Sequence, residues 1–337
     1  MKHLKVILLI CAVCTILFAC SSPDASSESL GPAHTDLYDL PVSAHTGTSD
    51  SGRHSQDDMT YLFSWGYDVF CPGKEMGLYR TEGQLVRSAV YQGGELSLGI
   101  KIYVSREDDE PVSFGIMVLA DGIPAEFVPD GGEKPTYMHP FYVVKEEVCK
   151  FSLTPKFKSE SGRIDIIIAA DLTNPEGDTA VLPVYVENQS GIYDAEDKTN
   201  YVKTSKLPPG FQPFPENNDA LVTYWLWPEN SDELSRSGPS AISKIGISSD
   251  GESWLYESTT GLPGRLRTIF FLDYKPYIVF GNEAFVDWNP TYGEMLSLPV
   301  SFREPEESSI FMPVTIRMDD TGMKYETIIL RRFLINP

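Results

Sequence analysis

Histidines that could act as bases or metal ligands are scarce in this chain. Three of the five histidines (His34, His45 and His54) lie in residues 21–57, and only His139 lies in the segments that we expect to fold. A single histidine excludes a zinc site with two histidine ligands and leaves one candidate base for a nucleophile. The earlier three, spaced 11 and 9 residues apart, match no compact ligand set. We predict no catalytic residue, metal site or cofactor.

Motifs for nucleotide binding and for hydrolysis are absent from the sequence, which contains no Gly-x-Ser-x-Gly, Gly-x-x-x-x-Gly-Lys-Ser/Thr or Gly-x-Gly-x-x-Gly. Carboxylates are the one catalytic resource in surplus, in the runs Glu107–Glu110 and Glu304–Glu307. Both runs lie between expected strands, where charge keeps a loop solvated, so we interpret them as loops rather than as the carboxyl pair of a glycoside hydrolase. The chain is predicted not to be an enzyme.

Two further sets of side chains leave alternatives open. The segment Asp171–Asp178 offers four oxygen donors in eight residues, but its order is not that of an EF-hand, and a polar turn is favoured over a calcium site. Cys71 and Cys149 are the cysteines of the expected folded region. They are either a disulfide or two separate buried thiols, and the lack of equivalent cysteines later in the chain favours the thiols.

Tryptophans are concentrated in the second half of the chain, which holds four of the five. Trp288 lies in Asp287–Glu294, a segment with the composition of a loop, together with Tyr292. An aromatic ring in a polar loop costs solvation unless it packs down or meets a ligand. We therefore predict Trp288 and Tyr292 as ligand-binding residues for a sugar face or a protein partner. The alternative is that Trp288 only covers the end of its domain.

The first twenty residues have the pattern of an export signal. Lys2 and Lys5 precede an uncharged run, Val6–Ala19, of 14 residues, which is shorter than the roughly 18–20 residues that span a bilayer. The run ends in Leu17-Phe18-Ala19-Cys20, which resembles the lipobox of bacterial lipoproteins. That resemblance implies removal of residues 1–19, acylation of Cys20 and an extracytoplasmic chain anchored by lipid to a bacterial membrane.

The segment after the signal has the composition of a tether. Residues 21–57 hold 12 Ser or Thr and a single aromatic residue, Tyr38. Such a segment buries too little apolar surface to offset its ordering entropy. Residues 20–57 are therefore predicted to be a disordered tether.

The rest of the chain contains an internal duplication. Thr179–Asn188 aligns without a gap with Thr327–Asn336, and Ile164–Asp171 aligns with Pro313–Asp320. Four further matches in the same order, with gaps in polar stretches, indicate two tandem units. The predicted boundaries are a first domain at 58–188, a Pro-rich linker at 189–218 and a second domain at 219–337.

Each unit is predicted to be a β-sandwich. The first holds about seven short β-branched or aromatic segments separated by turn signals. Leu96–Val104 alternates apolar and polar residues as a half-buried strand does, and Ile164–Ala170 is apolar almost throughout, as in a central strand. The arrangement resembles tandem immunoglobulin-like sandwiches, an all-β fold, although the Cys…Trp…Cys spacing of antibody domains is missing.

A formal charge of −21 would repel phosphate backbones, so we predict no nucleic-acid partner. Together these features predict a membrane-anchored, extracytoplasmic lipoprotein of the binding or adhesion type that recognises a protein or glycan. One alternative is a carboxylate-dependent, glycan-active enzyme. Another is a structural or accessory subunit of an envelope assembly.

Overall fold

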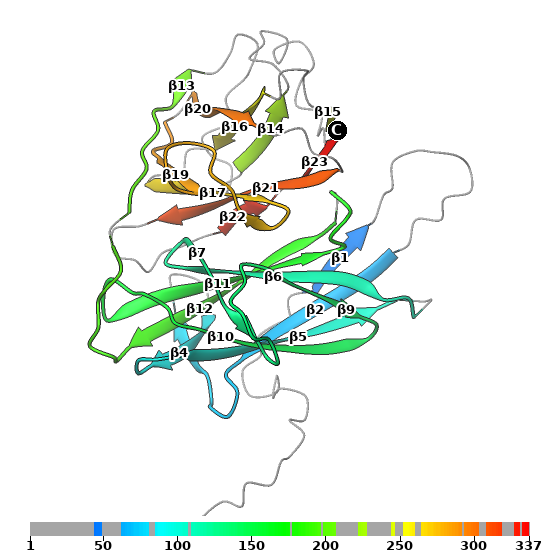
Figure 1. Ribbon diagram of the computed structural model, residues 1–337, viewed down its shortest axis with the longest axis vertical. Helices are drawn as coiled ribbons and strands as arrows, with labels where there is room; N and C mark the ends of the chain where they lie inside the picture. Colours follow the sequence, from blue (N-terminus) through cyan, green and yellow to red (C-terminus); the bar gives the residue numbers. More distant parts are fainter. Residues whose placement is uncertain are drawn as a thin grey trace, which may run out of the picture. The chain divides into compact units, whose positions relative to one another are not determined.

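Figure 1 shows the computed structural model of the chain, which describes residues 44–48, 62–80, 85–106, 109–175, 177–196, 198–206, 222–227, 244–246, 252–259, 264–291, 293–302, 308–318, 327–330 and 332–336. The acidic run Glu304–Glu307 lies outside these residues, as do Cys20 and Tyr292. The described residues form strands and turns without any helix, and so contain no helical segment that could cross a membrane. They confirm the all-β prediction. All strands belong to one compact unit, Val42–Pro337.

The first sandwich consists of two facing sheets. Its outer sheet has, in spatial order, the strands β1 (Ala44–Thr48), β2 (Leu62–Phe70), β5 (Leu96–Ser105), β10 (Glu146–Leu153) and β8 (Val128–Pro129). Its inner sheet has β3 (Gly77–Arg80), β4 (Leu85–Tyr91), β12 (Thr179–Asn188), β11 (Ser161–Ala170), β6 (Val112–Ala120) and β7 (Ile123–Ala125), with β9 (His139–Val143) also paired to β6. Strands β3, β4 and β9 were not predicted from the sequence.

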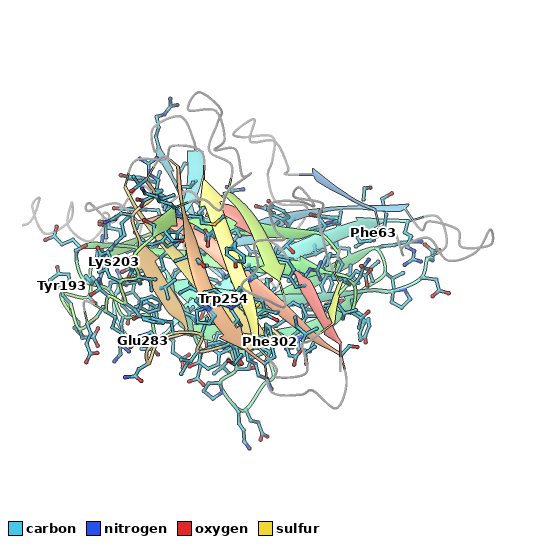
Figure 2. The ribbon with its side chains drawn as sticks, turned by 90° about the horizontal axis from the view of Figure 1, so that it is seen from above. Phe63, Tyr193, Lys203, Trp254, Glu283 and Phe302 are labelled. Atoms are coloured by element: carbon cyan, nitrogen blue, oxygen red, sulfur yellow. The ribbon has the colours of Figure 1, made fainter. Side chains whose placement is uncertain are left out.

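The second sandwich also has two sheets. Its outer sheet has the order β13 (Ser205–Lys206), β20 (Glu294–Ser301), β16 (Glu252–Thr259) and β14 (Val222–Trp227). Its inner sheet has β15 (Lys244–Gly246), β23 (Phe333–Asn336), β21 (Ser309–Met318), β17 (Arg265–Leu272) and β18 (Lys275–Pro276); β19 (Phe285–Trp288) pairs with β17 and β22 (Thr327–Leu330) with β21. Phe302, labelled in Figure 2, is buried in this core and packs edge-on against Phe311 at 5.2 Å between ring centroids.

The two sandwiches share one strand order. The outer sheets correspond as β2-β5-β10 and β14-β16-β20, and the inner sheets as β4-β12-β11-β6-β7 and β15-β23-β21-β17-β18. In each inner sheet the last strand of the repeat pairs in parallel with an early one, β12 with β4 and β23 with β15. This is the A-B-E and G-F-C order of immunoglobulin-like sandwiches. The predicted fold class of two tandem immunoglobulin-like sandwiches is confirmed by this order.

The bend after β6 in the first sandwich has the same geometry as the bend after β17 in the second. Asp121 and Asp273 both adopt the left-handed region, with φ of 47° and 49°, which Asp tolerates better than most residues. The Asp121 carboxylate accepts the Arg163 N–H at 2.9 Å, and the Asp273 carboxylate accepts the Ile310 N–H at 2.9 Å. The two bends share the sequence Asp-x-x-Pro, at Asp121–Pro124 and Asp273–Pro276, and this geometry.

The predicted alignment of the final strands is wrong by one residue. Val184 and Val186 of β12 face the first core, whereas Phe333 and Ile335 of β23 face the second. The gapless alignment of Thr179–Asn188 with Thr327–Asn336 would instead place Val184 on Arg332. Because side chains alternate with period two, a one-residue slip exchanges the faces of the whole strand.

Both inner sheets are buried on two faces. In β11, Ile164, Ile166 and Ile168 point into the first core, while Ile167 and Ala169 belong to a different apolar cluster. We name this cluster the shared core; it contains Met117, Leu119, Ile167 and Ala169 of the first sandwich and Ile269, Phe271, Tyr274, Phe285, Ile310, Met312, Val314, Ile316 and Met318 of the second. Two-sided burial explains why β11 is apolar at nearly every position.

The segments outside the predicted domains are partly ordered, which corrects two predictions. Ala44–Thr48, inside the predicted tether, pairs with β2 as strand β1. Within the predicted linker, Ser205–Lys206 pairs with β20 and the Asn200 N–H donates to Asp287 Oδ2 at 3.0 Å. Residues 198–206 are thus part of the second sandwich. Proline content indicated a connector but carried no information on these hydrogen bonds.

Candidate functional site

A cavity of about 610 Å³ lies at the edge of the first sandwich, where β7 and β8 end their sheets. It is bounded by β7 and β8, by residues 154–158 after β10, and by the Pro-rich linker after β12, whose lining residues are 194–196 and 198 and which we call the connector. Its lining residues are Glu95, Ala120, Asp121, Ile123, Pro124, Ala125, Glu126, Phe127, Val128, Pro135, Ser152, Leu153, Thr154, Pro155, Lys156, Lys158, Asp194, Ala195, Glu196 and Lys198. No pattern in the sequence indicates this cavity.

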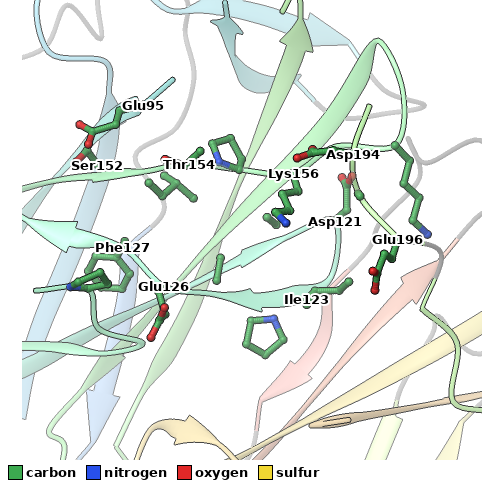
Figure 3. Close-up of a pocket in the computed structure, with 18 of the residues that line it drawn as sticks. Glu95, Asp121, Ile123, Glu126, Phe127, Ser152, Thr154, Lys156, Asp194 and Glu196 are labelled. Atoms are coloured by element: carbon green, nitrogen blue, oxygen red, sulfur yellow. The ribbon is translucent and has the colours of Figure 1, made fainter. Parts of the chain in front are cut away.

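The cavity combines a non-aromatic apolar lining with charges of both signs. Phe127 is the one aromatic residue of the lining, and it is 1% exposed and packs on Phe151 at 5.1 Å between centroids. Figure 3 shows Glu95 and Phe127 toward one end and Lys156, Asp194 and Glu196 toward the other. Mixed charge around aliphatic and prolyl surface suits a ligand that carries both polar and apolar groups.

The connector wall of the cavity is fixed to both sandwiches. The Ala195 N–H donates to the Phe157 carbonyl of the first sandwich at 3.4 Å. The Lys198 ammonium lies 3.1 Å from a Glu283 carboxylate oxygen, and the Lys198 carbonyl accepts a hydrogen bond from Arg267 Nη2 at 2.7 Å. The wall is therefore positioned by residues of the second sandwich as well as the first.

Arg267 is held in turn by a buried carboxylate. It donates to both oxygens of Asp287, at 2.9 and 3.1 Å, and its guanidinium lies 3.8 Å from the centroid of the Phe285 ring. Arg267 and Asp287 are almost fully buried. This bidentate geometry fixes the orientation of the third bond, from Arg267 to the connector.

Asp121 lines the cavity, and the pKa of its carboxyl is raised. Burial is the main cause that raises the pKa of Asp121 to about 6, against the lowering effect of the hydrogen bond from the Arg163 N–H. A raised carboxyl pKa in a cavity is also a property of general acids. The same bend at Asp273 in the second sandwich indicates that Asp121 instead anchors a turn.

The prediction that Trp288 binds a ligand is wrong. Trp288 lies in strand β19, is 0% exposed and is part of the second core. Its indole N–H donates to Thr268 Oγ1 at 3.0 Å. The alternation in Phe285–Trp288, with Val286 and Trp288 on the core face, was the signal in the sequence that the loop interpretation overlooked. The partner residue of that prediction, Tyr292, lies outside the described residues.

The Asp171–Asp178 loop already holds a cation, which is the guanidinium of Arg332. Arg332 donates to the carbonyls of Asp171 (2.9 Å), Ala170 (2.6 Å) and Asp178 (3.0 Å). A Cβ on Gly177 would lie 2.3 Å from Arg332 Nη2, so the glycine makes the approach possible. The polar-turn interpretation of this loop agrees with its geometry, because its carbonyls serve Arg332.

The cysteines and the histidine do not form a reactive pair. Cys71 and Cys149 are free and buried, and burial raises the pKa of the Cys149 thiol to about 12, which disfavours the thiolate. Cys71 directly follows β2 and Cys149 lies on β10, with β5 between these two strands, so the two Cα atoms are about 10 Å apart at least, too far for a disulfide. His139 is half-buried, its pKa is lowered by burial, and its ring stacks on Phe141. No group of three or more His, Cys, Asp or Glu among the described residues could hold a metal ion.

Comparison with known proteins finds no matching family model and no match among curated proteins. Solved structures with a similar arrangement include a protein of unknown function from Porphyromonas gingivalis W83, with 11% identity, coverage of 80% of this chain and 97% of that one, and a TM-score of 0.21. The N-terminal Ig1-2 module of the Drosophila receptor protein tyrosine phosphatase DLAR has 10% identity, coverage of 80% and 99%, and a TM-score of 0.21. The periplasmic chaperone SfaE has 10% identity, coverage of 74% and 96%, and a TM-score of 0.19. These TM-scores are low, so the fold assignment depends on the strand order itself.

Proposed function

We propose that this chain is an extracytoplasmic binding protein, anchored to a bacterial membrane through Cys20, that holds a segment of a protein partner in the cavity of the first sandwich. The observation that carries the proposal is the cavity itself, formed by the first sandwich and by the connector, which is held in turn by residues of the second. A preformed concave site loses little entropy when a ligand orders in it.

The lining favours a protein segment over a glycan. Sugar faces are recognised by exposed flat rings, and the single aromatic residue of this lining, Phe127, is buried. The lining instead combines aliphatic and proline side chains with charged ones such as Glu126 and Lys156, which suits the mixed apolar and polar side chains of a peptide. The net charge of −21 further favours a partner segment that carries basic residues, because the field of the protein attracts it.

Binding without catalysis fits the chemistry of the cavity residues. The Asp121 carboxylate accepts a backbone N–H as part of a turn, which gives this carboxyl a structural role. Lys198 is paired with Glu283. The enzyme alternative therefore has less support from this site than a binding role.

Membrane anchoring gives the first testable prediction. Cys20→Ala should leave the chain as an uncleaved precursor or in a shed form, because the acyl acceptor and cleavage signal are removed. Fractionation and labelling with a fatty-acid analogue measure this, with Cys14→Ala, within the apolar run, as the control that keeps acylation. A Cys20→Ala chain that is processed and membrane-bound like the parent would contradict lipid anchoring.

The cavity is tested by site-specific photocrosslinking in intact cells. A photoreactive residue at Glu126, on the exposed rim, should capture a protein partner, whereas the same residue at Glu147, exposed on β10 and outside the lining, should not. Ala195→Trp should reduce the Glu126 product at least tenfold, because the indole fills part of the cavity. Adducts that resist protease and are cleaved by glycosidases, or equal capture from both positions, would refute the proposal.

A further inference from the structure

The core of the second sandwich contains a carboxyl group. Glu257 lies on β16 and is 0% exposed. Its side chain bridges the two sheets, because its contacts are the hydroxyls of Thr268 on β17 and Thr315 on β21. Burying a carboxylate without a cation partner costs free energy, so the protonation state of Glu257 has to be explained.

Four polar contacts connect the groups around Glu257. Glu257 Oε2 lies 2.7 Å from Thr268 Oγ1, and Glu257 Oε1 lies 2.6 Å from Thr315 Oγ1. The two threonine hydroxyls lie 2.8 Å apart, and the Trp288 indole N–H donates to Thr268 Oγ1 at 3.0 Å. Each contact is short enough to require a hydrogen atom between its two heavy atoms.

The number of hydrogens decides the protonation state. With Glu257 ionised, the network has three hydrogens: one on the indole and one on each threonine hydroxyl. Both hydroxyl hydrogens would then point to the carboxylate, and the two threonine oxygens would face each other at 2.8 Å with no hydrogen between them. A proton on Glu257 supplies the fourth hydrogen. The carboxyl and the two hydroxyls then donate in sequence around a closed ring.

We propose that Glu257 is protonated in the folded protein at neutral pH and closes a ring of hydrogen bonds with Thr268 and Thr315 that acts as an alkaline-sensitive lock on the second sandwich. The described groups in hydrogen-bond contact with the carboxyl are the two hydroxyls, with the Trp288 indole behind Thr268. The cross-strand neighbours of Glu257 are Leu296 on β20 and the titratable Tyr224 on β14. The pKa of Glu257 is shifted by burial and by these two hydroxyls, and no charged side chain among the described residues contributes to the shift.

The direction of the pH effect follows from the shift. Burial raises the pKa of Glu257 from 4.5 to about 8 in the folded protein. The stabilising effect of its proton is therefore fully present below pH 4.5 and is lost as the pH rises through about 8. Between pH 4.5 and about 8, unfolding releases one proton from Glu257, so the folding equilibrium constant should fall about tenfold per pH unit in this range.

Denaturant unfolding of the whole chain between pH 5.5 and 9.5 tests the lock. Relative to Glu257→Gln, which keeps a donor and an acceptor without titrating, the parent should lose at least about a hundredfold in folding equilibrium constant between pH 5.5 and 8. Glu147→Gln, at an exposed position of β10, should follow the parent. Parallel profiles of the parent and Glu257→Gln would overturn the proposal.

Infrared spectroscopy of the parent provides a test that does not require the variant to fold. The folded chain at pH 7 should show the carbonyl stretch of a protonated carboxylic acid, and this band should disappear on titration above pH 9. A spectrum at pH 7 without that band would show an ionised Glu257 and would equally overturn the proposal.

Discussion

Ile167→Asp should destabilise the chain by more than about 4 kcal/mol, the range reached when an unpaired charge is buried. Ile167 is 0% exposed and lies in the shared core, on the face of β11 that does not contact the first core. The carboxylate would meet Met and Ile side chains of the second sandwich without a hydrogen-bond partner. Urea unfolding measures the loss, and proteolysis within residues 198–206 should accelerate because the sandwiches separate.

Val148→Asp is the matched control for this prediction. Val148 is also an apolar strand residue of the first sandwich, but it is 41% exposed on β10. Its replacement by aspartate should change the free energy of unfolding by less than about 0.5 kcal/mol. Equal effects of the two substitutions would show that the face of β11 carrying Ile167 is not a core, and the two sandwiches would then be independent domains.

Arg332→Met should lower the free energy of unfolding by about 3–5 kcal/mol, since hydrogen bonds from a charged donor contribute about 1.5–3 kcal/mol each and buried acceptors are left unpaired. The lost partners are the carbonyls of Ala170, Asp171 and Asp178 and the Tyr274 hydroxyl, which lies 3.1 Å from Nη1. The three carbonyls belong to the first sandwich and Arg332 to the second, so both sandwiches should lose stability.

Two comparison variants separate the guanidinium geometry from charge. Arg332→Lys should recover only part of the stability, because one ammonium cannot reach acceptors that two guanidinium nitrogens share. Lys275→Met removes an exposed cation from the β18 turn and should have little effect. If Arg332→Met unfolds at the same urea concentration as Lys275→Met, the guanidinium does not join the sandwiches.

The strands of the cores could be predicted where their sequence pattern is strong. Leu96–Ser105 alternates buried and more exposed residues over most of its length, as expected from the period of two. Ile164–Ala170 was read correctly as a central strand, but its sequence could not show that its second face meets another sandwich. The short strand Gly77–Arg80 and the Pro-containing strand His139–Val143 carry too little periodicity to be recognised.

The cavity could not be predicted in the same way, because it forms only when segments far apart in the sequence come together. Its lining residues range from Glu95 to Lys198 and come from separate strands and turns. Prolines at positions 124, 135 and 155 indicated bends in the sequence but not that these bends converge on one cavity. Trp288 was misassigned because its polar neighbours resembled a loop, whereas pairing with β17 places its ring in the core.

Hydrogen exchange with the crosslinked partner, once purified, tests the binding role most directly. We predict slower amide exchange on binding in the cavity segments, residues 123–128, 152–158 and 194–198, with no change in strand β9 around the exposed Tyr142. Slowed exchange in β9, with the three cavity segments unchanged, would place the partner elsewhere and contradict the binding role of the cavity.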